Sequence, residues 1–173
     1  VLNGFGPSYY QHWREQFGAK IGLRHCTNED QSLIQALLQL LQHAEIDFTI
    51  FFRKLAYASN DIYAQHGPHA LFADAEPWLT WAEQWHQRLA KEDAECDEQS
   101  TQHQNRVDQM LAVNPAFIPR NHQIEQIIED TIERNDFTLF EKFRQDLTTP
   151  YQDNEFWMAA PAPSTALYQT FCG

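Results

Sequence analysis

Apolar side chains recur at three- and four-residue steps along most of the chain, and this periodicity limits the fold more than any other feature. The clearest stripe lies in residues 33–41, where leucine and isoleucine share one helical face. Similar stripes follow in residues 48–55, 78–89, 107–111, 124–132 and 140–147. Strand-like alternation never extends beyond a few residues, and no segment repeats at a fixed period. The sequence therefore predicts an all-α fold, an irregular bundle of about seven helices.

Capping residues predict where several of these helices begin. Ser8, Asp47 and Asn121 precede apolar stripes, and each side chain can accept a hydrogen bond from an amide of the first turn. We therefore expect them to be N-caps. The segment from Thr27 to Asp30 resembles a capping box, and Pro77 suits the first turn of a helix because that position needs no amide donor.

Three stretches fall outside the helical pattern. Residues 60–75 contain a Gly-Pro pair and predict a loop. Residues 92–98 form a charge run, which we expect to be a solvated connector. Prolines at positions 150, 161 and 163 predict an extended tail over residues 148–173. The length suits one domain, so we interpret residues 1–173 as a single helical domain.

The charge balance narrows the range of partners. Lys and Arg total 12 against 24 Asp and Glu, which gives a formal net charge of -12. Such a chain repels nucleic acid and anionic membrane surfaces, so we expect neither as a partner. No apolar run approaches the roughly 18–20 residues of a membrane-spanning helix. The three cysteines are widely spaced, which favours a reducing cytoplasm over a disulfide framework.

The motifs of nucleotide and nucleophile chemistry are not found in the sequence. It has no glycine-rich phosphate loop, no His-Arg-Asp or Asp-Phe-Gly triplet and no Gly-x-Ser-x-Gly. His66 and His69 are close together, but we interpret them as solvated loop residues because zinc sites usually have more ligands. A small metal-dependent hydrolase is therefore the least favoured alternative. Cys26 follows His25 and either carries a lowered pKa or is a half-buried structural residue, which we favour.

Two arginines stand in rigid surroundings. Arg53 directly follows Phe51-Phe52, and Arg120 lies between a proline and Asn121. A guanidinium forms planar, paired hydrogen bonds, so each is predicted to be a buried brace to a carboxylate or a carbonyl. Contact with another domain, or with a phosphate-bearing ligand, is the alternative. The tryptophans at 78, 81 and 85 have helical spacing, which favours a place in the core over base stacking.

A distinctive block runs from Asn114 to His122 and reads Asn-Pro-Ala-Phe-Ile-Pro-Arg-Asn-His. Weaker segments accompany it in order: Lys20 to Leu23, Asp47 to Arg53, Trp81 with Arg88, and Phe171 to Gly173. Together they resemble the C-terminal region of the selenoprotein O family, whose members are pseudokinase-like protein adenylyltransferases. The resemblance covers nearly the whole chain, which we therefore expect to be a piece of a longer protein. The missing initial Met fits either a trimmed chain or a piece cut from a longer one, and the first residues show no signal-peptide pattern.

The resemblance implies a parent protein with a kinase-like fold that transfers AMP from ATP to Ser, Thr or Tyr hydroxyls, assisted by Mg²⁺ or Mn²⁺. The family's nucleotide and metal residues lie upstream. No catalytic, cofactor-binding or metal residue is therefore expected in this chain, which alone should be inactive. Its partners would be the kinase-like lobe that it supports and, through the whole enzyme, protein substrates.

The resemblance also supplies candidate residues. Those for a structural brace or an interdomain contact are Asp47, Thr49, Arg53, Trp81, Arg88, Asn114, Pro115, Arg120 and Asn121. Cys172 matches the family's terminal cysteine or selenocysteine and is the redox candidate. A helical piece separated from its lobe should expose an apolar patch, which can drive formation of a homodimer.

A second hypothesis belongs to another class of protein. The chain would then be a free-standing acidic helical module that binds a partner helix in an apolar groove. The reading frame upstream of Val1 discriminates the two hypotheses. A continuous frame with kinase-like motifs supports the first, and a start codon directly ahead of Val1 supports the second.

Overall fold

The computed structural model describes residues 5–95 and 102–160 and contains only helices and loops within those ranges. The all-α prediction is confirmed, with eight α-helices against about seven expected. The chain divides into two compact units, Val1–Ala116 and Phe117–Gly173, whereas its length alone suggests one domain over residues 1–173. None of the helices in the described ranges is both long and apolar enough to cross a lipid bilayer.

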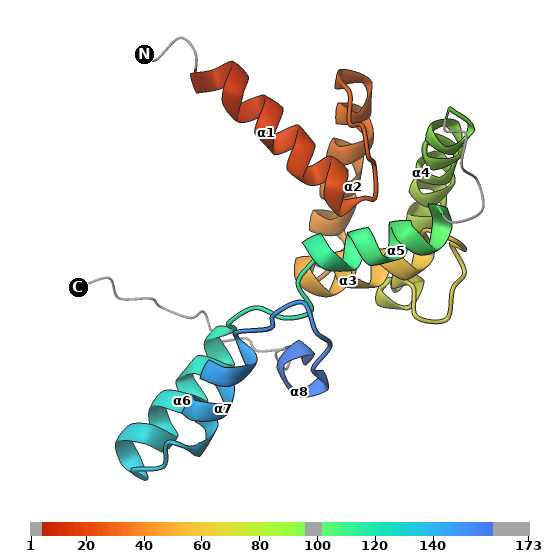
Figure 1. The fold of residues 1–173 in the computed structure, drawn as a ribbon. Coiled ribbons are helices and arrows are strands. Elements are labelled where there is room, and N and C mark those ends of the chain that lie inside the picture. The colour runs from red at the N-terminus through yellow and green to blue at the C-terminus, as the bar shows by residue number, and fades with distance from the viewer. Residues whose placement is uncertain (1–4, 96–101, 161–173) are drawn as a thin grey trace. The chain divides into compact units, whose positions relative to one another are not determined.

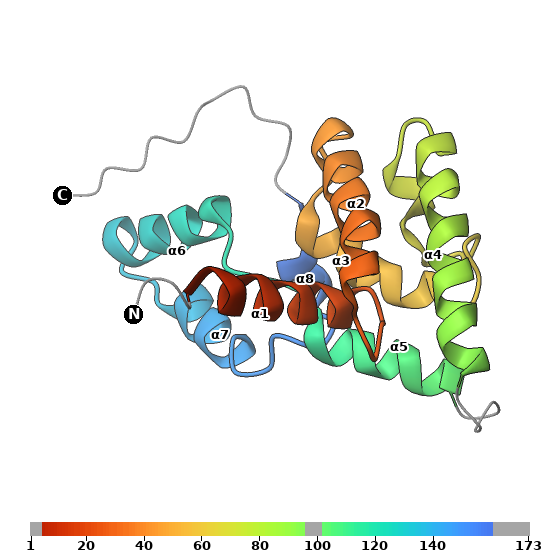
Figure 2. The same cartoon turned by 90° about the horizontal axis from the view of Figure 1, so that it is seen from above.

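The first unit contains five α-helices and two short 3₁₀ turns (Figure 1). The α-helices are α1 (Phe5–Lys20), α2 (Gln31–His43), α3 (Phe48–Ala58), α4 (Glu76–Ala94) and α5 (Gln102–Val113), and the turns are η2 (Asn28–Asp30) and η3 (Pro68–Leu71). Helix α5 packs on α1 and α3, and α2 packs on α4. Figure 2 shows α2 and α4 running side by side.

Local capping chemistry explains several helix starts. The Asp47 carboxylate accepts a hydrogen bond from the Ile50 amide at 2.9 Å, so its predicted role as N-cap of α3 is confirmed. The capping box from Thr27 to Asp30 is also present. Two predictions were wrong. Helix α1 begins before Ser8, since a proline in the first turn costs no hydrogen bond, and Asn121 is the first residue of α6 while Arg120 occupies its N-cap position.

The core of the first unit is aromatic, as the helical stripes predict. Trp78, Trp81 and Trp85 follow one face of α4 and are 0%, 4% and 0% exposed. Two of these indoles donate to backbone carbonyls: Trp85 to the buried Ile21 carbonyl at 2.8 Å and Trp81 to the partly buried Leu33 carbonyl at 2.9 Å. These hydrogen bonds therefore connect α4 to the turn after α1 and to α2.

Gly22 allows that turn to form. Its φ is +77°, a left-handed conformation that side chains disfavour. A Cβ atom placed on it would also lie 2.7 Å from the Met110 sulfur of α5, well inside van der Waals contact. The turn can therefore pass close against α5 only with glycine at this position.

The second unit is smaller and contains α6 (Asn121–Glu133), α7 (Thr138–Asp146) and the single turn α8 (Glu155–Met158). Helices α6 and α7 form an antiparallel pair, visible in Figure 1. Asn135, with φ 51°, makes the reversal between them. Trp157 of α8 is fully buried, and its indole donates to the Asp146 carboxylate at 2.6 Å.

Two expectations for the second unit need correction. Ile128, Ile132 and Phe140 are 50%, 76% and 42% exposed, although the stripe on residues 124–132 and the pattern on 140–147 predicted a core. The α6 stripe is wider than one neighbouring helix covers, so the core of this unit receives Ile127 and Phe143 instead. The predicted extended tail over residues 148–173 contains α8, which Asn154 caps, and residues 161–173 lie outside the described residues.

Candidate functional site

The last two turns of α4 carry the most concentrated charge chemistry in the first unit. Arg88 donates from Nε to an Asp30 carboxylate oxygen at 2.6 Å and from Nη2 to the His25 carbonyl at 2.8 Å. Asp30 is 3% exposed. Burial alone raises the pKa of Asp30, but hydrogen bonds from Arg88 and Thr27 outweigh burial and hold that pKa below its usual value. The pair therefore fixes the loop before α2 onto α4.

Glu92 lies one turn further along α4 and is also buried. Its carboxylate accepts hydrogen bonds from the backbone amides of Arg24 and His25 at 3.1 and 3.0 Å. The Arg106 guanidinium of α5 lies 3.4 Å from its second oxygen. The expectation of a solvated connector over residues 92–98 is therefore wrong at its start, because α4 continues to Ala94 and Glu92 holds the chain after α1 in place.

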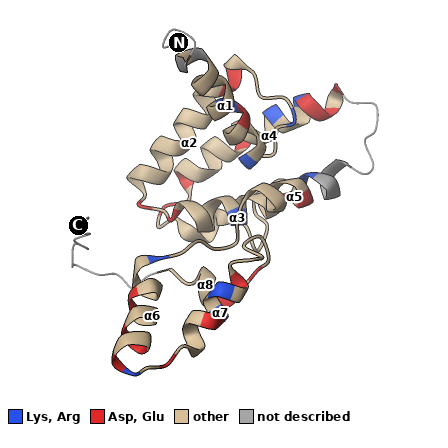
Figure 3. Cartoon of the chain, turned by 60° about the vertical axis from the view of Figure 1, so that its left-hand side comes forward, with Lys and Arg blue, Asp and Glu red and all other residues tan. Residues whose placement is uncertain are grey.

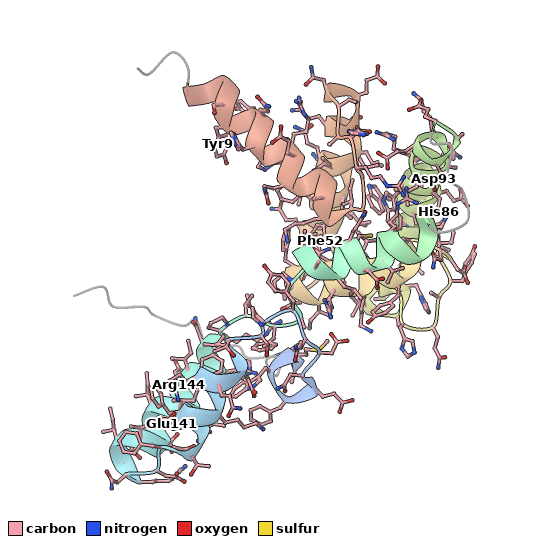
Figure 4. The ribbon with its side chains drawn as sticks, in the orientation of Figure 1. Tyr9, Phe52, His86, Asp93, Glu141 and Arg144 are labelled. Carbon is pink, nitrogen blue, oxygen red and sulfur yellow. The ribbon has the colours of Figure 1, made fainter. Side chains whose placement is uncertain are left out.

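Arg106 completes the network. It is only 1% exposed. Its guanidinium donates two hydrogen bonds, of 2.8 and 2.6 Å, to the Asp93 carboxylate, and its Nε donates to the Gly22 carbonyl at 3.1 Å. Burial lowers the pKa of Arg106, but the bonds and charges of Asp93 and Glu92 outweigh it and raise that pKa. The network balances three arginines, Arg24, Arg88 and Arg106, against Asp30, Glu92 and Asp93. Figure 4 labels Asp93 on α4.

A second polar cluster joins α1, α3 and α5. Arg53 is 4% exposed, and its Nη1 donates to the carbonyls of Leu111 and Asn114 at 2.8 and 3.1 Å. The Asn114 amide donates to the Lys20 carbonyl at 2.9 Å, and its oxygen accepts from the Lys20 ammonium at 3.2 Å. The same ammonium lies 5.4 Å from the centre of the Phe52 ring, labelled in Figure 4. These contacts seal the end of α5 against the end of α1.

The sequence-derived candidates do not meet at one place. Arg53 and Asn114 share the second cluster, Arg88 belongs to the network, and Pro115 follows the cluster half-buried. Thr49 lies half-buried in the first turn of α3. Asp47 caps α3, Trp81 lies in the core, and Arg120 and Asn121 open α6 in the second unit. Cys172 lies outside the described residues. Whether any of them contacts another domain stays a prediction.

An open, mostly apolar groove of about 740 Å³ lies between α2 and α4 on the first unit. It is lined by Ala36, Gln39, Leu40, His43, Ala44, Phe72, Ala73, Asp74, Pro77, Thr80, Trp81 and Gln84. Within residues 5–95 and 102–160, no three His, Cys, Asp or Glu side chains are grouped so that they could hold a metal ion. Most of the groove lining is apolar.

Cys26 occupies a close contact with α1. A Cβ atom added to Gly18 would lie 2.4 Å from the Cβ of Cys26, so the thiol residue packs directly on the helix backbone. Burial, followed by the charge of Asp30, raises the pKa of Cys26 to about 11. Both observations favour the structural interpretation of Cys26 over an activated thiol.

Cys26 is accordingly expected to alkylate slowly. With the pKa raised from 9.0 to about 11, about 100-fold fewer thiolates are present at pH 8. The greater nucleophilicity of a more basic thiolate offsets part of this, which leaves the folded chain about tenfold slower than the urea-unfolded chain. Iodoacetamide labelling of the peptide that contains Cys26, followed by mass spectrometry, measures both rates. Equal rates, or a faster folded thiol, would contradict the expectation.

Known proteins match this chain along its whole length. The family model described as "Protein adenylyltransferase SelO" matches residues 1–148. The "Protein nucleotidyltransferase YdiU" of Rhizobium leguminosarum bv. trifolii is 39% identical over 176 residues, which cover 100% of this chain and 34% of the relative. The proteins of the same name from Rhizobium meliloti and Rhodopseudomonas palustris are 37% and 35% identical with the same coverage.

These matches place the chain among relatives named as protein nucleotidyltransferases, and the resemblance noted in the sequence is confirmed. The chain belongs to the SelO family. It spans about a third of the length of the curated relatives that it matches, so it corresponds to a part of such a protein.

Proposed function

We propose that these 173 residues are the non-catalytic helical part of a protein adenylyltransferase and that they support its kinase-like lobe. The family match over residues 1–148, in a chain that spans 34% of its relative, is the observation that carries the proposal. The parent protein would transfer AMP from ATP to Ser, Thr or Tyr hydroxyls of proteins with Mg²⁺ or Mn²⁺. Its ATP and metal sites would be built from residues outside this chain.

The chemistry of the first unit supports a scaffold role. Four of its charged side chains hold its own backbone: Glu92 accepts from two amides, and Arg53, Arg88 and Arg106 each donate to carbonyls. Phosphoryl-type transfer instead needs a phosphate cradle, a metal-holding acid and a positioned lysine together. A body fixed in this way can hold a neighbouring lobe in a constant position.

The test compares three proteins: the whole protein, these 173 residues alone and the remainder without them. Each is incubated with ATP labelled in its α-phosphate, Mg²⁺ or Mn²⁺ and a protein acceptor. We expect labelling by the whole protein, none by the 173 residues, and a lower melting temperature with weaker labelling for the remainder. Labelling by the 173 residues alone would overturn the non-catalytic assignment. A remainder as stable and as active as the whole protein would overturn the supporting role.

A further inference from the structure

The groove between α2 and α4 is a large apolar feature of the first unit that the described residues leave unfilled. Its lining includes Leu40, Phe72 and Trp81, together with the shorter side chains of Ala36 and Pro77. A groove lined in this way offers a partner a large contact at little cost in side-chain entropy, because its rings and short side chains have few rotamers. An exposed apolar groove lined by aromatic side chains is a candidate interaction site.

Helix α2 is also unusual in its charge. Its thirteen residues, Gln31–His43, contain no Asp, Glu, Lys or Arg, although the whole chain has 21% charged residues and a net charge of -12. In Figure 3 this helix carries neither acidic nor basic colour along its length. Its exposed positions are filled by Gln, Ser, Ala and His. Depletion of charged residues is typical of the core of a protein interface, since a buried charge is costly.

The candidate occupant of the groove is the part of the parent protein that lies outside these 173 residues. The YdiU relative is about three times as long as this chain, so about two thirds of it has no counterpart in these residues. A covalently connected partner of that size is present at high effective concentration, which favours it over any separate molecule. It needs no opposite charge to be recognised, which agrees with a groove whose lining holds a single acidic residue, Asp74.

We infer that the groove between α2 and α4 is the docking surface for the remaining two thirds of the parent protein. An apolar segment of that portion packs against Leu40, Phe72 and Trp81, while Gln39 and Gln84 offer hydrogen bonds at the edge. This inference rests on the proposed function for the identity of the occupant. It deepens that function by naming the surface through which support is given.

Photo-cross-linking in the whole protein tests the inference. Gln39, which lines the groove, and Gln35, which is exposed on the same helix but does not line it, are each replaced by p-benzoylphenylalanine. After irradiation, we expect position 39 to give peptides joined to sequence outside these 173 residues, and position 35 to give none. Cross-links from position 39 to residues 117–173, to a second copy distinguished by isotope labelling, or to no protein segment would each overturn the inference.

A pair of arginine variants provides a test that does not depend on the bulky cross-linking side chain, which can itself obstruct the groove. Ala36→Arg places a charge in the groove, and Gln35→Arg places the same charge on the adjacent exposed position. We expect Ala36→Arg to lower the melting temperature of the whole protein by a few degrees and Gln35→Arg to leave it unchanged. Equal melting temperatures would count against the docking surface. Neither experiment measures AMP transfer, so a failed adenylylation assay and a failed docking test remain distinguishable.

Discussion

Arg106→Met is expected to lower the free energy of unfolding of the chain by about 3–5 kcal/mol, because it breaks a buried ion-pair network from one side. Arg106 is 1% exposed and forms four hydrogen bonds, to Asp93, Glu92 and the Gly22 carbonyl. Methionine fills a similar volume, so the loss measures stranded partners rather than a cavity. Urea unfolding followed by circular dichroism gives the value.

Two companion variants show whether the loss comes from the network. Lys91→Met removes an equal charge from an exposed position of α4, and we expect a change within about 0.5 kcal/mol. Arg106→Lys keeps the charge, but an ammonium cannot form the coplanar pair of hydrogen bonds that the guanidinium makes to Asp93. We therefore expect an intermediate loss. If Arg106→Met cost no more than Lys91→Met, the network would contribute nothing measurable to stability.

The network shows where sequence reasoning stops short. The apolar stripe of α4 runs through 78, 81, 85 and 89, and the next position in that series is 92. Periodicity thus places Glu92 on the buried face, whereas the surrounding run of acidic residues favours a solvated position. The buried charge of Glu92 is compensated by Arg106 of α5. Arg106 lies on the same face of α5 as the buried Met110, one turn away. In the sequence, the signal for this buried ion pair is a Glu on the apolar face of one helix and an Arg on the apolar face of another.

Other parts of the structure could be predicted because they depend on local chemistry. The cap at Asp47, the tryptophan core and the all-α class follow from residues within one or two turns of each other. The partners of Arg53 could not be predicted, because the Leu111 and Asn114 carbonyls lie about sixty residues away along the chain. The exposure of Ile132 could not be predicted for the same reason, because the burial of a side chain depends on which distant segments the fold packs against it.

Trp85→Ala is expected to destabilise the first unit by about 3–5 kcal/mol, the range for removing a buried aromatic side chain. Trp85 is 0% exposed and stacks on Trp81 with ring centroids 5.5 Å apart. Its indole is also the donor to the buried Ile21 carbonyl at 2.8 Å, next to the turn that Gly22 makes. Alanine therefore leaves both a cavity and an unsatisfied acceptor, and urea unfolding monitored at 222 nm measures their sum.

A second substitution divides that sum into its parts. Trp85→Phe keeps one aromatic ring but has no donor, so its expected cost of about 1–3 kcal/mol combines the stranded Ile21 carbonyl with a smaller cavity than alanine leaves. Tyr63→Ala removes an aromatic side chain that is 63% exposed and should change stability by less than about 0.5 kcal/mol. A Trp85→Phe variant as stable as the native chain would show that packing alone fixes α4 against the turn. A Trp85→Ala variant as mild as Tyr63→Ala would remove Trp85 from the core altogether, and with it the rigid frame on which the groove between α2 and α4 depends.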